Sequence, residues 1–273
     1  MALNVSTNVP SLTAQRHLAN SESILTRSFQ RLSSGLRINS AADDAAGLAI
    51  ADKLRADIRI AGQAIRNAND GISAISISEK AMGEVGDILT RLSELAQQSA
   101  TGLVSDTQRS ALQLEFTALV SEIERISNTT SFNGVNLLSG GTTINLQVGL
   151  DGTTNSRLSF STVDVSASSL SIGSLAVSSQ PAAQSAIGTI ISAIETIATK
   201  RGSLGAVESR LNTAIANLRV ARENFAAAES RIRDADVAEE TANLTRASIL
   251  QQAGVAVLAQ ANQQPALALQ LLG

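Results

Sequence analysis

Apolar residues recur every three or four positions over long stretches of both halves of the chain. In the first half the pattern runs through about 43–99, and in the second half it returns after Pro181. The clearest positions are Leu54, Ile58, Ala61, Ile65, Ala68, Ile72 and Ile75, and later Leu204, Val207, Leu211, Ala214, Leu218, Ala221, Phe225, Ala228 and Ile232. This spacing is typical of helices packed as a coiled coil. The pattern predicts two long helices lying antiparallel in a rod.

The apolar seam of the first half shifts in phase before it resumes at Met82, close to Gly83 and Gly86. A shift of this kind changes a supercoil locally. These two glycines, together with Gly205, are therefore predicted to mark a place where a helical assembly could switch between two packings.

The start of the first long helix carries a capping pattern. Ser40 stands three residues before Asp43, which is the spacing of a capping box. Asp43 and Asp44 would then lie in the first turn, where the helix dipole favours carboxylates. Ser40 is the predicted N-cap residue.

The period changes between the two halves of the chain. A second helix is predicted over about 105–128, followed by a β-hairpin in which Ile144, Leu146 and Val148 alternate and Leu158 and Phe160 return. The segment 153–179 contains 13 Ser or Thr residues and two charged residues, which favours an exposed loop with short strands. The expected fold is mainly α, with a small β-hairpin region at about 132–180.

Both ends of the chain are nearly free of charge. No charged side chain precedes Arg16 or follows Arg246. A membrane helix needs about 20 mostly apolar residues, but amide side chains interrupt the C-terminal stretch. No basic segment followed by an apolar one marks a cleaved signal peptide. The two ends, over about 4–35 and 236–270, are predicted to be helices that pack against other chains.

Apolar positions within these ends are the predicted assembly contacts. They are Leu3, Val5, Leu12, Leu18, Leu25, Leu244, Leu250, Val255, Leu258, Leu267 and Leu271. A helix pair this thin buries too little surface to be stable alone. It is expected to order on association.

Composition argues against several classes of function. The net charge of −3 gives no basic footprint for nucleic acid. The chain has no Cys and one His, His17, which is predicted to be a packed or solvated side chain. No catalytic constellation, metal-ligand cluster or phosphate loop is recognisable. No cofactor is therefore expected, and the chain is predicted not to be an enzyme.

Several long motifs resemble bacterial flagellin. They are RLSSGLRINSAADDAAGLAIADKLRADI at 31–58, RNANDGIS at 66–73, SFNGVNLL at 131–138 and the C-terminal stretch at 230–273. The resemblance implies a short flagellin without large outer domains, which polymerises into the extracellular filament used for swimming. It also implies terminal helices 1–39 and 234–273 in an inner tube. The segments 40–180 and 181–233 would then form the surrounding rod, and the loop at Ser40 the spoke between them.

The resemblance also implies partners. Flagellins are exported by a type III apparatus and meet an export chaperone, the export gate, a filament cap and hook-associated proteins. A vertebrate Toll-like receptor binds a flagellin surface that matches Arg91, Leu95 and Glu115 here, although Ser93 departs from the usual residue. A hook–filament junction protein and a coiled-coil signalling ligand remain as alternatives.

Overall fold

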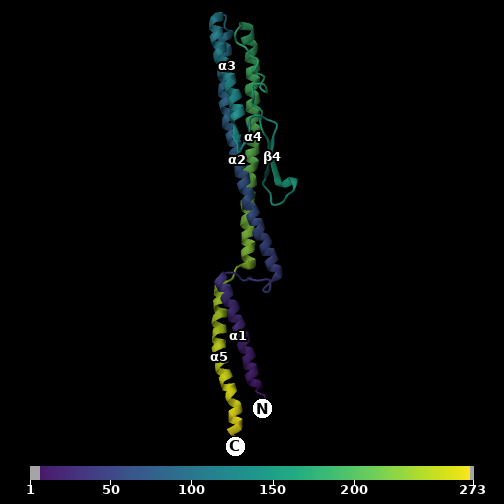
Figure 1. The fold of residues 1–273 in the computed structure, drawn as a ribbon, viewed down its shortest axis with the longest axis vertical. Helices are drawn as coiled ribbons and strands as arrows, with labels where there is room; N and C mark the ends of the chain where they lie inside the picture. The colour runs from purple at the N-terminus through teal and green to yellow at the C-terminus, as the bar shows by residue number, and fades with distance from the viewer. Residues whose placement is uncertain (1–6, 271–273) are drawn as a thin grey trace. The chain divides into compact units, whose positions relative to one another are not determined.

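The computed structural model describes residues 7–270, and their side chains as far as residue 263. The chain is mainly helical (Figure 1). The elements in chain order are α1 (Val9–Ser34), α2 (Ala45–Ala100), α3 (Asp106–Thr129), β1 (Ser131–Phe132), β2 (Val135–Asn136), β3 (Thr143–Gln147), the 3₁₀ helix η1 (Thr154–Ser156), β4 (Arg157–Ser161), α4 (Gln180–Arg233) and α5 (Val237–Gln270).

The chain divides into two compact units. One unit comprises 1–58 and 223–273, and the other comprises 59–222. The second unit contains most of α2 and α4, the whole of α3 and both small sheets. Its core is built mainly from aliphatic side chains with few aromatic ones, among them the fully buried Met82, Leu89, Phe116, Ile123 and Ile190.

Within the second unit α2 and α4 run side by side in opposite directions (Figure 1). Glu79 of α2 pairs with Arg201 of α4 at 3.2 Å. The antiparallel helical rod predicted from the seams is confirmed. Both helices also begin and end within two residues of the expected positions.

The predicted phase shift in α2 is wrong. Buried residues follow one another at alternating spacings of three and four from Ala61 to Ser99. Gly71 and Ser78 occupy two of these buried positions. Because neither residue has a hydrophobic side chain, the sequence pattern looked interrupted where the packing is continuous. Gly83 and Gly86 therefore lie beside an unbroken seam, and the argument for a switch at these glycines fails.

Two antiparallel hairpins follow α3. The turn between β1 and β2 places Asn133 and Gly134 at φ 48° and 78°, as a two-residue hairpin turn requires. In the larger hairpin Ile144 pairs with Phe160 and Leu146 with Leu158, so the predicted hairpin is confirmed. The connection between its strands contains η1 and spans residues 148–156, so it is much longer than a two-residue hairpin turn.

The larger hairpin packs on α2 at Gly71. A Cβ atom built on Gly71 would collide with the side chain of Leu146. In addition, the Asn67 side chain donates a hydrogen bond of 3.0 Å to the carbonyl oxygen of Gln147. Glycine is thus required here by close approach, not by backbone conformation.

The segment that follows β4 is not the exposed loop that its Ser/Thr content predicted. Between 162 and 177 the buried side chains are Thr162, Val163, Val165, Ala167, Leu170, Ile172 and Val177. The backbone is held by α3, since Glu124 accepts from the Ala167 N–H at 2.9 Å and Gln113 from the Val177 N–H at 2.5 Å. Spaced apolar residues decide the burial of this segment, and hydroxyl residues fill the positions between them.

Glycines in α2 offer a matched test of this packing. We expect Gly71→Ala to lower the stability of the chain by about 1–3 kcal/mol through overpacking against Leu146. Gly86→Ala meets no atom within 4 Å and should instead stabilise α2 by up to about 1 kcal/mol through helix propensity. Thermal unfolding followed by circular dichroism measures both effects, and shifts of the same sign would contradict this account.

Candidate assembly interface

Small side chains line the contact between α1 and α5. The small buried residues are Ser11, Ala14, Ser21 and Ser28 on α1 and Ala247 and Ala261 on α5, and the larger Glu240 is buried beside them. The helices are antiparallel, since Asn8 donates to the carbonyl of Ala261 at 2.8 Å at one end and Arg31 lies 3.7 Å from Glu240 near the other. Small residues let the helices approach closely but remove little apolar area from water.

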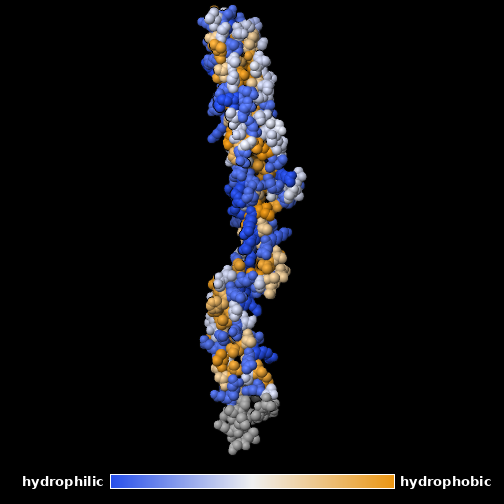
Figure 2. Space-filling view, viewed as in Figure 1, coloured by the Kyte–Doolittle hydropathy of each residue, from blue (hydrophilic) through white to orange (hydrophobic). Residues whose placement is uncertain are grey.

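Large apolar side chains of the same pair lie on the outside. They are 47–62% exposed and comprise Val9, Leu12, Ile24 and Phe29 on α1 and Val237, Ile249, Leu250, Val255 and Val257 on α5. Figure 2 shows hydrophobic residues on the surface of this pair. A soluble monomer rarely exposes an extensive apolar surface unless it binds something. We call these nine residues the outer apolar face.

The predicted assembly contacts divide into three groups. Leu12, Leu250 and Val255 belong to the outer apolar face. The half-buried residues are Leu18, Leu25, Leu244 and Leu258. Leu3, Val5 and Leu271 lie outside the described residues, as does the side chain of Leu267. Sequence reasoning missed the other six residues of the outer apolar face, which are Val9, Ile24, Phe29, Val237, Ile249 and Val257. Inspection of the apolar positions that fall between the buried ones on each helix would have found most of them.

Leu18 shows why some predicted contacts are internal. It continues the three-and-four spacing of the buried serines on α1, and a methyl group added at Gly254 would come within 3.4 Å of its side chain. Gly254 thus accommodates Leu18 within the pair. A seam leucine of this kind holds α1 on α5 and leaves less surface for a neighbouring chain.

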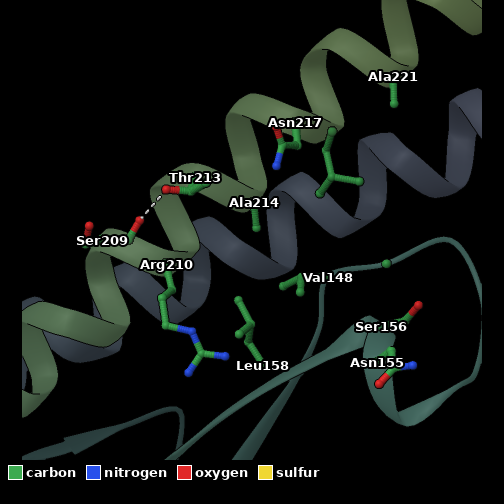
Figure 3. Close-up of a pocket in the computed structure, with 12 residues that line it drawn as sticks. Val148, Asn155, Ser156, Leu158, Ser209, Arg210, Thr213, Ala214, Asn217 and Ala221 are labelled. Carbon is green, nitrogen blue, oxygen red and sulfur yellow. Dashed lines mark hydrogen bonds between the residues drawn. The ribbon is translucent and has the colours of Figure 1, made fainter.

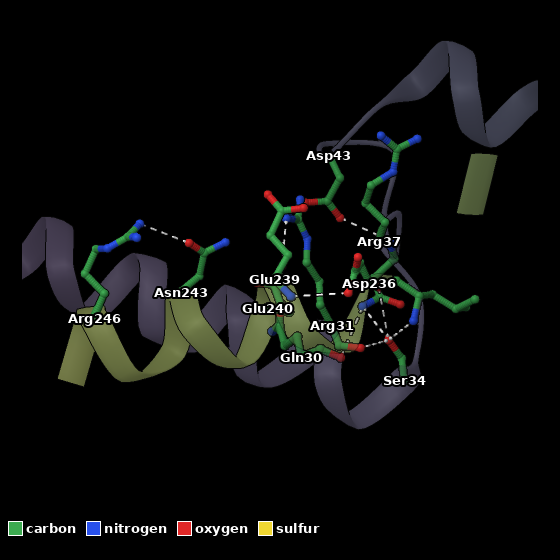
Figure 4. A network of polar contacts seen from close by, with 12 residues as sticks. Gln30, Arg31, Ser34, Arg37, Asp43, Asp236, Glu239, Glu240, Asn243 and Arg246 are labelled. Atoms are coloured by element: carbon green, nitrogen blue, oxygen red, sulfur yellow. Dashed lines mark hydrogen bonds and ion pairs between the residues drawn. The ribbon is translucent and has the colours of Figure 1, made fainter. Parts of the chain in front are cut away.

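Two short linkers tie the helix ends together in this unit. Gly35 ends α1 in the left-handed conformation at φ 70°. The Arg37 N–H then donates to the Arg233 carbonyl at 2.6 Å, and the Ala235 N–H donates to the Gly35 carbonyl at 3.0 Å. Figure 4 shows Arg37 and Asp236 in the surrounding polar network. Asp236 begins α5, because its carboxylate accepts from the Ala238 N–H at 2.8 Å.

The spoke loop differs from the predicted capping box. The helix begins at Ala45, and the Asp44 carboxylate accepts from the Gly47 N–H at 2.9 Å. Asp44 is therefore the capping side chain, and the prediction of Ser40 as N-cap is wrong. The Asp43 carboxylate accepts instead from the Ser40 N–H at 3.0 Å and the Ser40 hydroxyl at 3.1 Å, which closes a turn before the helix.

This turn perturbs the Asp43 carboxyl group. The hydrogen bond from the Ser40 N–H is the main cause that lowers the pKa of Asp43 below its ordinary value. The Ser40 hydroxyl, the Asn39 N–H and the charge of Arg31 act in the same direction. Each of these groups stabilises the charged carboxylate.

The residues of the suggested receptor surface are only partly exposed. Arg91 on α2 donates to Glu115 on α3 at 2.8 Å, and both side chains are about half exposed. Leu95, however, is 1% exposed and belongs to the core. Its assignment to an exposed surface is wrong, because Leu95 lies beside the seam position Ala96 and is part of the same core. Leu114, 75% exposed on α3, is the large apolar neighbour of Glu115 on the surface.

Other chemistry has little support in the described residues. His17 is exposed on α1. In residues 7–270 no three His, Cys, Asp or Glu side chains gather where they could hold a metal ion. Within the same part of the chain, no helix combines the length and hydrophobicity needed to cross a membrane.

The spoke turn gives a pH prediction. Because folding lowers the pKa of Asp43, the stabilisation of the turn is complete above about pH 5 and is lost as pH falls through the folded-state pKa. Ser40→Ala should raise the pKa of Asp43 toward its ordinary value, and Asp43→Asn should remove this acid-dependent step. A carboxyl titration by NMR measures the shift; an Asp43 that titrates at an ordinary pKa in the unmodified chain would refute the geometry.

Comparison with known proteins shows the family of the chain. The N-terminal helical region of bacterial flagellin matches residues 5–143, and the C-terminal helical region matches residues 187–272. The chain is 46% identical to a flagellin of Halalkalibacterium halodurans, over 97% of this chain and 98% of the relative. It is 39% identical to a flagellar filament 33 kDa core protein of Treponema phagedenis, over 97% and 98% of the two chains.

A solved structure agrees with these sequence matches. The crystal structure of Bacillus cereus flagellin is similar with a TM-score of 0.51 and 28% identity, over 56% of this chain and 88% of that one. The two family regions together span most of the chain, one toward each end. The chain belongs to the bacterial flagellins, a family of structural proteins and not of enzymes.

Proposed function

We propose that the chain polymerises into a flagellar filament by packing its outer apolar face against other copies of itself. A structural filament subunit is the function that the family match and the relatives support. The match includes the C-terminal helical region, and nothing favours the hook–filament junction alternative. The observation that carries the proposal is the inverted distribution of side chains in the α1–α5 pair, with small residues inside and large apolar residues outside.

Physical reasoning links this surface to an open polymer. The outer apolar face is found on both helices of one pair, so a chain can contact more than one neighbour. Contacts between different patches of identical chains do not close on themselves unless the rotation happens to form a ring. They therefore generate a helical filament. We assign the inner part of that filament to 1–39 and 234–273, and the surrounding part to 40–180 and 181–233.

We further propose that the chain acts outside the cell. Export in an unfolded state would suit a chain without cysteine, and a chaperone that covers the terminal helices would prevent early association. The export gate, the filament cap and hook-associated proteins are the other proposed partners. Each of them would meet the helical ends of the chain before or during assembly.

Polymerisation onto seeds tests the role of the outer apolar face. Replacing Ile249 and Val257 by Ser should raise the critical concentration about tenfold or more. Burial of the exposed part of each apolar side chain contributes about 1 kcal/mol to association, and the variant lacks both contributions. Gln252→Ser is the matched control on the same helix because it removes no apolar side chain. Circular dichroism of the soluble chain should show unchanged helix content in all three proteins. Normal growth of the double variant would overturn the assigned surface.

Receptor recognition by the exposed Arg91–Glu115 pair is a separate proposal. We expect the free chain to activate a reporter cell line that carries the Toll-like receptor for flagellin. Substituting Arg91 and Glu115 by Ala should reduce activation, whereas Arg125→Ala, which breaks another exposed helical ion pair, should not. A monomer that is inactive at micromolar concentration, beside an active reference flagellin, would refute this proposal and leave the filament function untouched.

A further inference from the structure

A pocket with an apolar floor lies between the larger hairpin and α4. Its volume is about 570 Å³ and it is open on one side. Val148 and Leu158 from the hairpin and Ala214 and Leu218 from α4 provide its apolar part. Figure 3 shows Arg210 extending from α4 toward the hairpin beside Leu158. We call this recess the hairpin pocket.

Arg210 gives the hairpin pocket a positive rim. The guanidinium makes no ion pair or hydrogen bond with any residue in the described part of the chain. The other rim residues, among them Asn217 and Ser209, are neutral. An occupant that combines an apolar side chain with a nearby carboxylate would match both parts of the pocket.

The turn between α2 and α3 presents such a combination. Leu103 is 95% exposed, more than any other large hydrophobic residue in the described part of the chain. The side chain of Asp106, three residues later, is fully exposed. The turn is also held by hydrogen bonds: buried Arg109 donates to the Thr101 carbonyl at 3.0 Å, and Ser105 caps α3 through a reciprocal capping box. Arg109 also lies 3.7 Å from Asp106, whose fully exposed carboxylate can still face a second cation. A projecting leucine held in this way loses little conformational entropy on binding.

The turn and the hairpin pocket are far apart within one chain. The pocket residue Val148 directly follows Gln147, which is bonded to Asn67 of α2. From Asn67 to the end of α2 at Ala100 there are 33 residues, or about 50 Å at 1.5 Å per residue. The turn therefore cannot reach the pocket of its own chain. It can reach the pocket of a second copy displaced by about 50 Å along the helices.

We propose that Leu103 of one copy inserts into the hairpin pocket of a second copy, with Asp106 facing Arg210. This inference rests on the proposed filament function and adds a specific lengthwise contact to it. A projection at one place and a matching recess at another give a heterologous contact, which repeats without limit. The contact also predicts a lengthwise subunit repeat of about 50 Å.

Cysteine cross-linking tests this contact directly, because the chain has no cysteine of its own. In filaments of Leu103→Cys/Asn217→Cys, mild oxidation should give a ladder of disulfide-linked multimers on a denaturing gel. The same protein kept monomeric should give none. The control Leu103→Cys/Ser192→Cys carries its second thiol at an exposed position elsewhere on α4 and should stay unlinked in filaments.

Polymerisation gives an independent measurement. Leu103→Ser should raise the critical concentration about tenfold or more, and Leu103→Met should restore near-normal growth because it keeps an apolar side chain. If unmodified chains form no filament, the proposed function itself fails. If filaments form but the 103–217 pair stays unlinked, or cross-links no better than 103–192, the hairpin pocket is not the partner of the turn and only this inference is overturned.

Discussion

The behaviour of the terminal helices depends on which side chains they place in their mutual contact. Serine, alanine and glycine can bring α1 and α5 close together, but they supply little of the apolar burial that stabilises a helix pair in water. The large apolar residues that could supply it, such as Phe29 and Ile249, point outward instead. In the proposed filament, neighbouring copies would supply the missing stabilisation, and folding of the ends would then be coupled to assembly.

In the unit formed by 59–222 most of the large apolar side chains lie inside. Its leucines, isoleucines and Phe116 are buried, and an uninterrupted seam runs along α2. Such a unit can be stable before assembly. A rigid unit also fixes the separation between surface features such as the turn at Leu103 and the hairpin pocket. This separation can define a lengthwise repeat only because α2 is one continuous helix between them.

The sequence predicted those features in which local pattern and tertiary packing agree. The alternation of Ile144 and Leu146, and then of Leu158 and Phe160, specified the two strands of the hairpin. Predictions failed where the type of a residue did not indicate whether its position is buried. The seam of α2 looked interrupted because Gly71 and Ser78 occupy two of its buried positions. The buried residues Val165 and Ile172 were not recognised because hydroxyl residues surround them in the sequence. The terminal helices were recognised, but an apolar pattern alone does not tell whether a leucine faces its own partner helix, as Leu18 does, or a neighbour, as Leu12 does.

The linkers explain how the two ends of one chain act together. The hydrogen bonds between Arg37 and Arg233 and between Gly35 and Ala235 fix where α1 ends and α5 begins. Asp236 then caps the start of α5 directly after this linker, so the antiparallel contact of the two helices begins within a few residues of the linkers. The residues of the outer apolar face come from segments more than 200 residues apart, and the linkers hold both segments in one helix pair. Loss of this linkage would therefore be expected to weaken the proposed assembly without changing a single residue of the outer apolar face.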